Sequence, residues 1–180
     1  MTLRCAVVVM GVSGSGKSTI GAAIADALAL RFVDGDSLHS PASVKRMQSG
    51  VPLTDDDRWP WLDRIGAELA DAVRSPAGVV IACSALKRAY RDRIRAAAPA
   101  VRFVFLDGAR ETIEARMATR SGHYMPTSLL ASQLATLERP GRDERDVLTL
   151  SIAVPVADIV DAAVRALTPS AADDVGTRTS

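Results

Sequence analysis

Short runs of apolar residues alternate along this chain with longer segments in which apolar residues recur every three or four positions. Uninterrupted apolar, β-branched runs are typical of strands buried on both faces of a parallel sheet, whereas the longer segments have the spacing of amphipathic helices. The predicted strands lie at residues 5–10, 31–33, 79–83, 101–106 and 147–152. The predicted helices lie at residues 19–30, 40–49, 54–73, 85–98, 110–119, 129–137 and 156–167.

This alternation predicts a three-layer α/β sandwich around a parallel sheet of about five strands. The 180 residues, 48% of them hydrophobic, suit one domain with a single core, which we place at residues 1–167. Residues 168–180 are small and polar and are predicted to form a disordered tail. Ligands bind at the carboxyl ends of the strands in such sheets, so polar residues that directly follow a strand are the first candidates for a site.

The charge and the hydropathy of the chain limit its partners and its location. A formal net charge of +1 gives no broad basic field, so we expect no nucleic acid and no membrane surface as partner. No apolar run approaches the ~18 residues that a membrane span needs, and no signal segment precedes the first strand, so we expect a cytoplasmic protein. Cys5 and Cys83 lie in apolar runs, where buried structural thiols are the usual finding.

Residues 11–19 fit the phosphate-binding pattern G-x-x-x-x-G-K-[ST] and lie between a predicted strand and a predicted helix, as the motif requires. Glycines let the backbone curl so that its N–H groups point at phosphate oxygens, and the helix N-terminus adds its positive dipole end. Lys17 is expected to reach the β- and γ-phosphates of ATP, and Ser18 to ligate Mg²⁺. The predicted nucleotide-binding residues of this loop are Gly11, Ser13, Gly14, Ser15, Gly16, Lys17, Ser18 and Thr19.

Asp34 and Asp36 flank a glycine directly after the second predicted strand. An Asp-Gly pair is a frequent turn, and taken alone the pattern favours only a turn. Phosphoryl transfer, however, needs a carboxylate on the metal side and a base that accepts the proton of the acceptor hydroxyl. No aspartate ends the strand at 79–83, so we assign Asp34 to the metal, through water. Asp36 is predicted to be the catalytic base and a hydroxyl ligand.

Several cationic residues are candidates for an anionic substrate. Arg58 follows three aspartates whose simplest role is to begin a helix, and it either holds a substrate carboxylate in its planar fork or pairs with these aspartates. Ser84, Lys87 and Arg91 follow the strand at 79–83, where Lys87 or Arg91 facing the strand ends would attract an anion. A solvated basic helix face is the alternative for the arginines farther along this helix.

Arg116 and Arg120 lie four residues apart, and therefore on one helical face, ahead of an irregular segment with a glycine and a proline. This arrangement favours a helical lid at about residues 118–138 that brings positive charge to the transferring phosphoryl group. Both arginines are predicted to bind the nucleotide, and Arg120 to act in catalysis. His123 has no partner histidines or cysteines at metal spacing, which argues against zinc.

Together these segments resemble the gluconate kinases (gluconokinases) of the small P-loop type. The resemblance rests on residues 10–18, 34–39, 45–47, 50, 52–58, 60–62, 83–87, 90–92, 120–125 and 143–144. It implies a nucleoside-monophosphate-kinase-like fold, a mobile lid, a homodimer, and phosphorylation of D-gluconate at its 6-hydroxyl by ATP and Mg²⁺ to give 6-phosphogluconate. The implied substrate-binding residues are Asp36, His39, Arg58, Ser84, Lys87, Arg91 and His123. Which cation meets the gluconate carboxylate is left open.

Two other functions compete with this interpretation. A kinase for another hydroxy acid, such as shikimate, would share the phosphate loop and the Asp34–Asp36 pair, although shikimate kinases usually place a glycine-rich turn where residues 84–91 lie. A regulatory nucleotide switch of the GTPase kind would need an [NT]-K-x-D motif, and none of the three lysines supplies one. A non-catalytic homologue is a third alternative, but every part assigned to catalysis is present.

Overall fold

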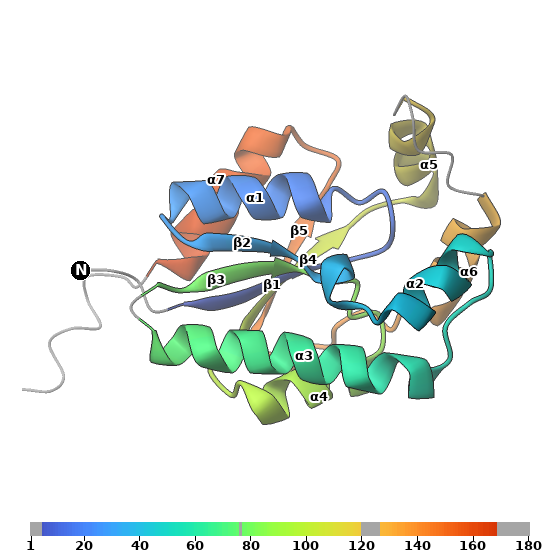
Figure 1. The fold of residues 1–180 in the computed structure, drawn as a ribbon. Helices are drawn as coiled ribbons and strands as arrows, with labels where there is room; N and C mark the ends of the chain where they lie inside the picture. Colours follow the sequence, from blue (N-terminus) through green and yellow to red (C-terminus); the bar gives the residue numbers. More distant parts are fainter. Residues whose placement is uncertain (1–4, 76, 120–126, 169–180) are drawn as a thin grey trace, which may run out of the picture.

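The computed structural model describes residues 5–75, 77–119 and 127–168. Its centre is a sheet of five parallel strands in the order β2-β3-β1-β4-β5 (Figure 1). The strands are β1 (Ala6–Met10), β2 (Arg31–Asp34), β3 (Val79–Ala82), β4 (Arg102–Asp107) and β5 (Val147–Ser151). The α/β prediction with a parallel sheet of about five strands is therefore confirmed.

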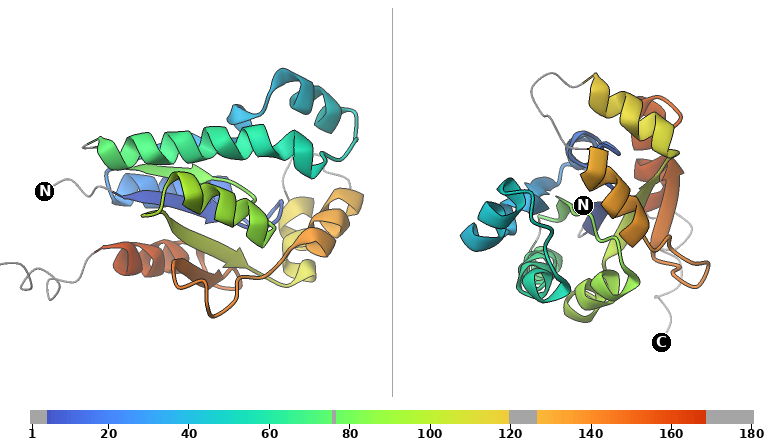
Figure 2. Two further views of the ribbon diagram at one scale, coloured as in Figure 1. Left: turned by 90° about the horizontal axis from the view of Figure 1, so that it is seen from below. Right: turned by 90° about the vertical axis from the view of Figure 1, so that its right-hand side faces the viewer.

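Helices cover both faces of this sheet. The helices are α1 (Lys17–Ala27), α2 (Pro41–Gln48), α3 (Asp55–Arg74), α4 (Arg88–Ala97), α5 (Arg110–Ala118), α6 (Thr127–Thr136) and α7 (Val156–Leu167), with a short 3₁₀ turn, η1 (Gly35–Leu38). Figure 1 shows α1 and α7 on one face, and α3 and α4 on the other. The helices α2, α5 and α6 gather beyond the carboxyl ends of the strands, where a ligand is expected in this class of fold (Figures 1 and 2).

The core divides into two apolar layers because successive strand residues point to opposite faces. In β1, Val8 packs in the layer of α3 and α4, whereas Val7 and Val9 pack in the layer of α1 and α7. All five residues of β1 are buried, which is why this strand reads as one apolar run rather than an alternating one. Burial of each valine or methionine side chain of β1 stabilises the fold by about 1.5–3 kcal/mol relative to an exposed position.

Two helices begin at places that matter for the site. Helix α3 begins after Thr54, which forms a capping box with Asp57: each side chain accepts a hydrogen bond from the backbone N–H of the other residue. Helix α4 begins at Arg88, three residues later than the sequence predicts. Residues 84–87 instead form an irregular connection in which Ala85 has the left-handed φ of 42°, and apolar spacing alone does not reveal this turn.

The predicted lid at residues 118–138 is described only in part, since residues 120–126 lie outside the described residues, as does all but the first residue of the predicted tail. Within the described chain, no helix is long and apolar enough to cross a membrane. The extent of the domain, 1–167, stays a prediction.

Candidate active site

The phosphate loop, residues 11–16, joins the carboxyl end of β1 to the start of α1. Gly14 has a φ of 79°, and a Cβ built there would come within 2.6 Å of Cγ of Met117 on α5. Gly16 precedes the helix in the left-handed conformation, with a φ of 99°. Both positions therefore need glycine, one for its conformation and for the close approach of α5, the other for its conformation.

The loop fits a phosphate chain. Helix α1 has no side-chain cap at its N-terminus and no acidic residue in its first turn, so its first N–H groups and dipole end face the loop without a competing carboxylate. Nζ of Lys17 lies over the loop and donates to the Val12 carbonyl at 3.1 Å. The Ser15 hydroxyl is buried and has no hydrogen-bond partner among the described residues. Ser18 is exposed on the first helical turn, where a hydroxyl ligand for a cation is expected.

Asp34 and Asp36 lie at the carboxyl end of β2. An Asp34 carboxylate oxygen, Oδ1, accepts the Asp36 backbone N–H at 3.0 Å and so caps η1. Partial burial raises the pKa of Asp36 above the ordinary aspartate value; the Lys17 ammonium opposes this shift, and the Asp34 carboxylate adds to it. The Asp36 side chain still reaches solvent, so its carboxylate is accessible to a substrate hydroxyl.

Two side chains of helix α3 hold this aspartate turn in place. The buried Trp61 donates from Nε1 to the Gly35 carbonyl at 2.7 Å, and Arg64 donates from Nε to the Leu38 carbonyl at 2.7 Å. These bonds fix both ends of η1, the turn that carries Asp36. These roles of Trp61 and Arg64 do not follow from the sequence, because nothing in a tryptophan or an arginine on a helix indicates which distant carbonyl it will meet.

His39 stacks on Trp61 with ring centroids 4.2 Å apart and an interplanar angle of 13°. The pKa of His39 falls to about 4, chiefly because the ring is partly buried and also because of the positive charges of Arg58 and Arg64. The imidazole is therefore neutral at pH 7. Its Nδ1 atom is buried without a hydrogen-bond partner in the described part of the chain, so it has an unused donor or acceptor to offer a ligand.

Lys87 and Arg58, two candidates for binding an anionic substrate, differ in their surroundings. Lys87 donates to both carboxylate oxygens of Asp55 at 2.9 Å, and the Tyr90 hydroxyl binds the same carboxylate. Arg58 stacks over the Tyr90 ring, with Cζ 5.6 Å from its centroid, and donates from Nε to the Leu53 carbonyl. Among the described residues no carboxylate lies within ion-pair distance of Arg58. Arg58 is therefore the better placed of the two to receive a substrate carboxylate.

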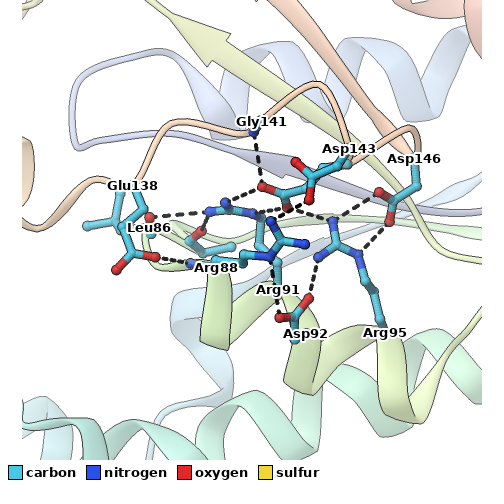
Figure 3. A network of polar contacts seen from close by, with 11 residues as sticks. Leu86, Arg88, Arg91, Asp92, Arg95, Glu138, Gly141, Asp143 and Asp146 are labelled. Atoms are coloured by element: carbon cyan, nitrogen blue, oxygen red, sulfur yellow. Dashed lines mark hydrogen bonds and ion pairs between the residues drawn. The ribbon is translucent and has the colours of Figure 1, made fainter.

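Arg91, which was predicted to bind the substrate, is instead buried in an internal ion pair. It is almost fully buried, 1% exposed, and donates from Nε and Nη2 to the two carboxylate oxygens of Glu144, both at 2.7 Å (Figure 3). Its Nη1 donates to the Ala85 and Leu86 carbonyls at 3.2 and 3.3 Å. With its donors used by internal partners, Arg91 is a structural residue, and we remove it from the substrate-binding set.

The pair formed by Arg91 and Glu144 belongs to a larger network that joins α4 to residues 138–146 (Figure 3). Arg95 binds Glu144 and Asp146 at 2.7–3.0 Å, and the exposed Arg88 binds Asp143. The network also fixes the connection at residues 84–87, where the Ser84 carbonyl accepts the N–H of Gly11 from the phosphate loop at 3.3 Å. Ser84 therefore lies beside the phosphate loop.

Replacing Arg91 with methionine tests this structural assignment. The variant leaves the buried Glu144 with Arg95 as its cationic partner, so we expect a loss of about 3 kcal/mol in the free energy of unfolding at pH 7. The hydrogen bonds of Arg91 are the main reason that the pKa of Glu144 falls to about 2, from 4.5. This stabilisation is complete above the unfolded-state pKa and disappears as the pH falls toward 2, so the difference between the two proteins should narrow there.

Chemical denaturation at several pH values measures this difference. Arg88→Met is the matched control, because Arg88 lies on the same helix in an exposed pair and its loss should have no measurable effect. Folded Arg91→Met should keep the parent KM for the acceptor. A variant with full stability and a raised acceptor KM would contradict the assignment.

Arg116 on α5 and Gln133 on α6 both approach the phosphate loop. Arg116 on α5 donates to the Ile152 carbonyl, and its Nη1 lies 3.8 Å from the position of a Cβ at Gly16. The Gln133 amide oxygen on α6 accepts the N–H of Ser13 at 2.6 Å. Nothing in the sequence singled out Gln133. Arg120 and His123, which were predicted to act in catalysis and substrate binding, lie outside the described residues.

The predicted residues Lys17, Asp36 and Arg58 converge near the end of β3. Their charges all act on the Cys83 thiol, whose pKa rises to about 12 chiefly because it is buried. Cys83 is therefore an unreactive structural thiol. The described residues contain no group of three or more histidine, cysteine or acidic side chains that could hold a metal ion by themselves. Mg²⁺ commonly needs only one or two protein oxygens besides substrate phosphates, and the exposed Ser18 and Asp34 can supply them.

Comparisons with known proteins place the chain in a family. A family model described as an AAA domain matches residues 7–140. The gluconokinase of Gluconobacter oxydans (strain 621H) is 49% identical over 76% of this chain and 77% of its own, and the thermosensitive gluconokinase of Escherichia coli (strain K12) is 44% identical over 86% and 82%. The crystal structure of a gluconokinase from Sinorhizobium meliloti 1021 superposes with a TM-score of 0.84 and 50% identity, and the match covers 93% of both chains.

Proposed function

This chain belongs to the gluconokinase family of P-loop kinases, and we propose that it transfers the γ-phosphoryl group of ATP to the 6-hydroxyl of D-gluconate, giving 6-phosphogluconate and ADP. The observation that carries this proposal is the placement of Asp36 within the electrostatic reach of Lys17, at one edge of the sheet, in a chain with gluconokinase relatives. The phosphate loop supplies the nucleotide side and the aspartate turn supplies the acceptor side.

The nucleotide side is the loop from Gly11 to Thr19. Its backbone N–H groups and the N-terminus of α1 favour the β- and γ-phosphates, and Lys17 adds a positive charge. Ser18 and Asp34 are the residues that would hold Mg²⁺, Asp34 through water. When bound, this ion supplies charge neutralisation between the β- and γ-phosphates. Arg116, beside Gly16, is proposed to contact the nucleotide.

The acceptor side centres on Asp36. Its carboxylate accepts the proton of the 6-hydroxyl as the oxygen attacks phosphorus, and the bond from phosphorus to the bridging oxygen of ADP breaks on the opposite side. A raised pKa makes Asp36 a stronger base than an ordinary aspartate. Trp61 and Arg64 orient it through the backbone of η1.

Gluconate is an anion with several hydroxyl groups, and the remaining residues match this chemistry. We assign the carboxylate to Arg58, since no described carboxylate pairs with it, and hydroxyl groups to the neutral His39 and to Ser84. Lys87, held by Asp55, contributes positive potential rather than a free donor. Arg120 is proposed to contact the phosphoryl group on the sequence pattern, and His123 to contact the substrate on the family resemblance. A homodimer is proposed from the family resemblance, and a cytoplasmic location from the lack of a recognisable signal segment in the sequence.

The test is ADP release from MgATP with a panel of acceptors: gluconate, shikimate, glucose, AMP and water alone. We expect turnover with gluconate and only background release with the other four. Turnover with shikimate would favour the other hydroxy-acid kinase and overturn the acceptor assignment. Equal release with every acceptor, water included, would instead indicate a slow nucleotide hydrolase of the regulatory kind.

A further inference from the structure

Gln133 lies on α6, within the range predicted as lid, yet it touches the phosphate loop. Its Oε1 atom accepts the N–H of Ser13 at 2.6 Å, across 120 residues of sequence. Since the Ser13 backbone can only donate at this point, the oxygen end of the amide must face it, and the Nε2 donors point elsewhere. Among the described residues Nε2 has no hydrogen-bond acceptor, so its two donors are available to another group.

Helix α6 is held in place on both sides of Gln133. Leu130, 1% exposed, is buried in the apolar layer that also contains Val12 of the phosphate loop, and Leu134 packs against the same layer. Beyond the helix, the Glu138 N–H donates to the Leu86 carbonyl at 2.9 Å, and the Glu138 carboxylate accepts the Arg88 N–H at 2.7 Å. Gln133 is thus presented to the loop by a helix that is anchored to the substrate-side connection at residues 84–88.

The Ser13 peptide lies within the phosphate loop, whose backbone N–H groups cradle phosphates, but its own N–H is taken by Gln133. Each peptide N–H has one hydrogen, so the partner of Ser13 fixes the orientation of this peptide plane. We propose that Gln133 is a positioning residue of the phosphate site: it sets the Ser13 peptide from α6, and nucleotide affinity depends on it. This inference rests on the proposed function, because it assigns a residue to the same nucleotide site.

Two substitutions separate positioning from simple helix packing. Gln133→Met keeps the length and the apolar contacts of the side chain but cannot accept the Ser13 N–H. Gln133→Glu keeps an acceptor, loses the two Nε2 donors and places a negative charge beside the loop. The matched control is Ser132→Ala on the same helix, where Ser132 is exposed and only its backbone carbonyl accepts a hydrogen bond.

The measurement is calorimetric binding of MgATP to the full chain, at low and high salt, with thermal unfolding alongside. We expect Gln133→Met to weaken binding about three- to tenfold, the loss of roughly one net hydrogen bond. Gln133→Glu should weaken MgATP binding by more than about tenfold at low salt, because the added carboxylate repels the phosphates. High salt should reduce this effect. Ser132→Ala should bind as the parent does, and kcat of Gln133→Met at saturating ATP should stay within about threefold.

Two results would overturn the inference. Parent-like MgATP affinity in Gln133→Met would show that the Ser13 contact does not set the site. Equal losses in both variants, independent of salt and matched by lower unfolding temperatures, would reduce Gln133 to a packing residue. If the parent protein itself bound no nucleotide, the proposed function would fall first, so the two failures are distinguishable.

Discussion

Lys17→Ala is expected to abolish phosphoryl transfer, with a fall in kcat of about 10³- to 10⁵-fold, the range seen when a cation that stabilises the transferring group is removed. The Lys17 ammonium already lies over the phosphate loop, bonded to the Val12 carbonyl. No other lysine can replace it, since Lys87 is held by Asp55 and Lys45 is exposed on α2. ADP formation from MgATP and gluconate, at saturating concentrations of both, measures the effect.

The control for this experiment is Lys45→Ala, which removes an exposed lysine and should leave turnover unchanged. Thermal unfolding of both variants checks that the fold is kept. A Lys17→Ala protein that turned over within tenfold of the parent would show that the loop and the metal suffice, and the role given to Lys17 would be wrong.

Asp36→Asn should lower kcat with gluconate by about 10²- to 10⁴-fold, the usual contribution of a general base. Asparagine keeps the shape of the side chain but cannot take the hydroxyl proton. The KM for ATP should change by less than about threefold, because Asp36 acts on the acceptor side. The pH profile adds a second readout. Burial raises the pKa of Asp36, so parent activity should fall as the pH drops through that pKa and the carboxylate takes a proton.

The residual activity of Asp36→Asn should lack this acidic limb, because its side chain no longer titrates. Asp71→Asn, in an exposed pair on α3, serves as the control and should behave as the parent. If Asp36→Asn turned over like the parent, the base assignment would have to be abandoned, while the phosphate-loop assignment would stand.

The sequence predicts most of the strands, the helix that follows the phosphate loop, and the parallel sheet, because these features depend on local patterns. The run before Gly11 is apolar because β1 is buried on both faces, and the glycines are required by backbone conformations confined to a few residues. The strand ends then bring Asp36 and Ser84 to one edge without further information. These features are predictable because each depends on residues that are close together in the sequence.

The residues misjudged or overlooked depend on partners far away in the chain. Arg91 looks like a substrate cation until Glu144, 53 residues later, is seen to bind it. Gln133 looks like an ordinary helical residue until it meets Ser13. The later start of α4 has the same origin, because the Arg91 guanidinium donates to the carbonyl of Ala85, the residue with the left-handed backbone. Charge and spacing indicate that a side chain needs a partner, but only the tertiary structure identifies it.

The strand order β2-β3-β1 sets the distance between the two halves of the proposed active site. Strand β2, which leads into the proposed base Asp36, and β1, which leads into the phosphate loop, are separated by β3, hence by two steps of about 4.8 Å in the plane of the sheet. If β2 and β1 were neighbours in the sheet, their backbones would be half as far apart, and the attacking oxygen would not fit between the proposed base and the phosphate. The interval of roughly 10 Å leaves room for a hydroxyl and a phosphoryl group to stand in line. The distance between the proposed base and the phosphate loop is thus set by the hydrogen-bonded backbone of the sheet.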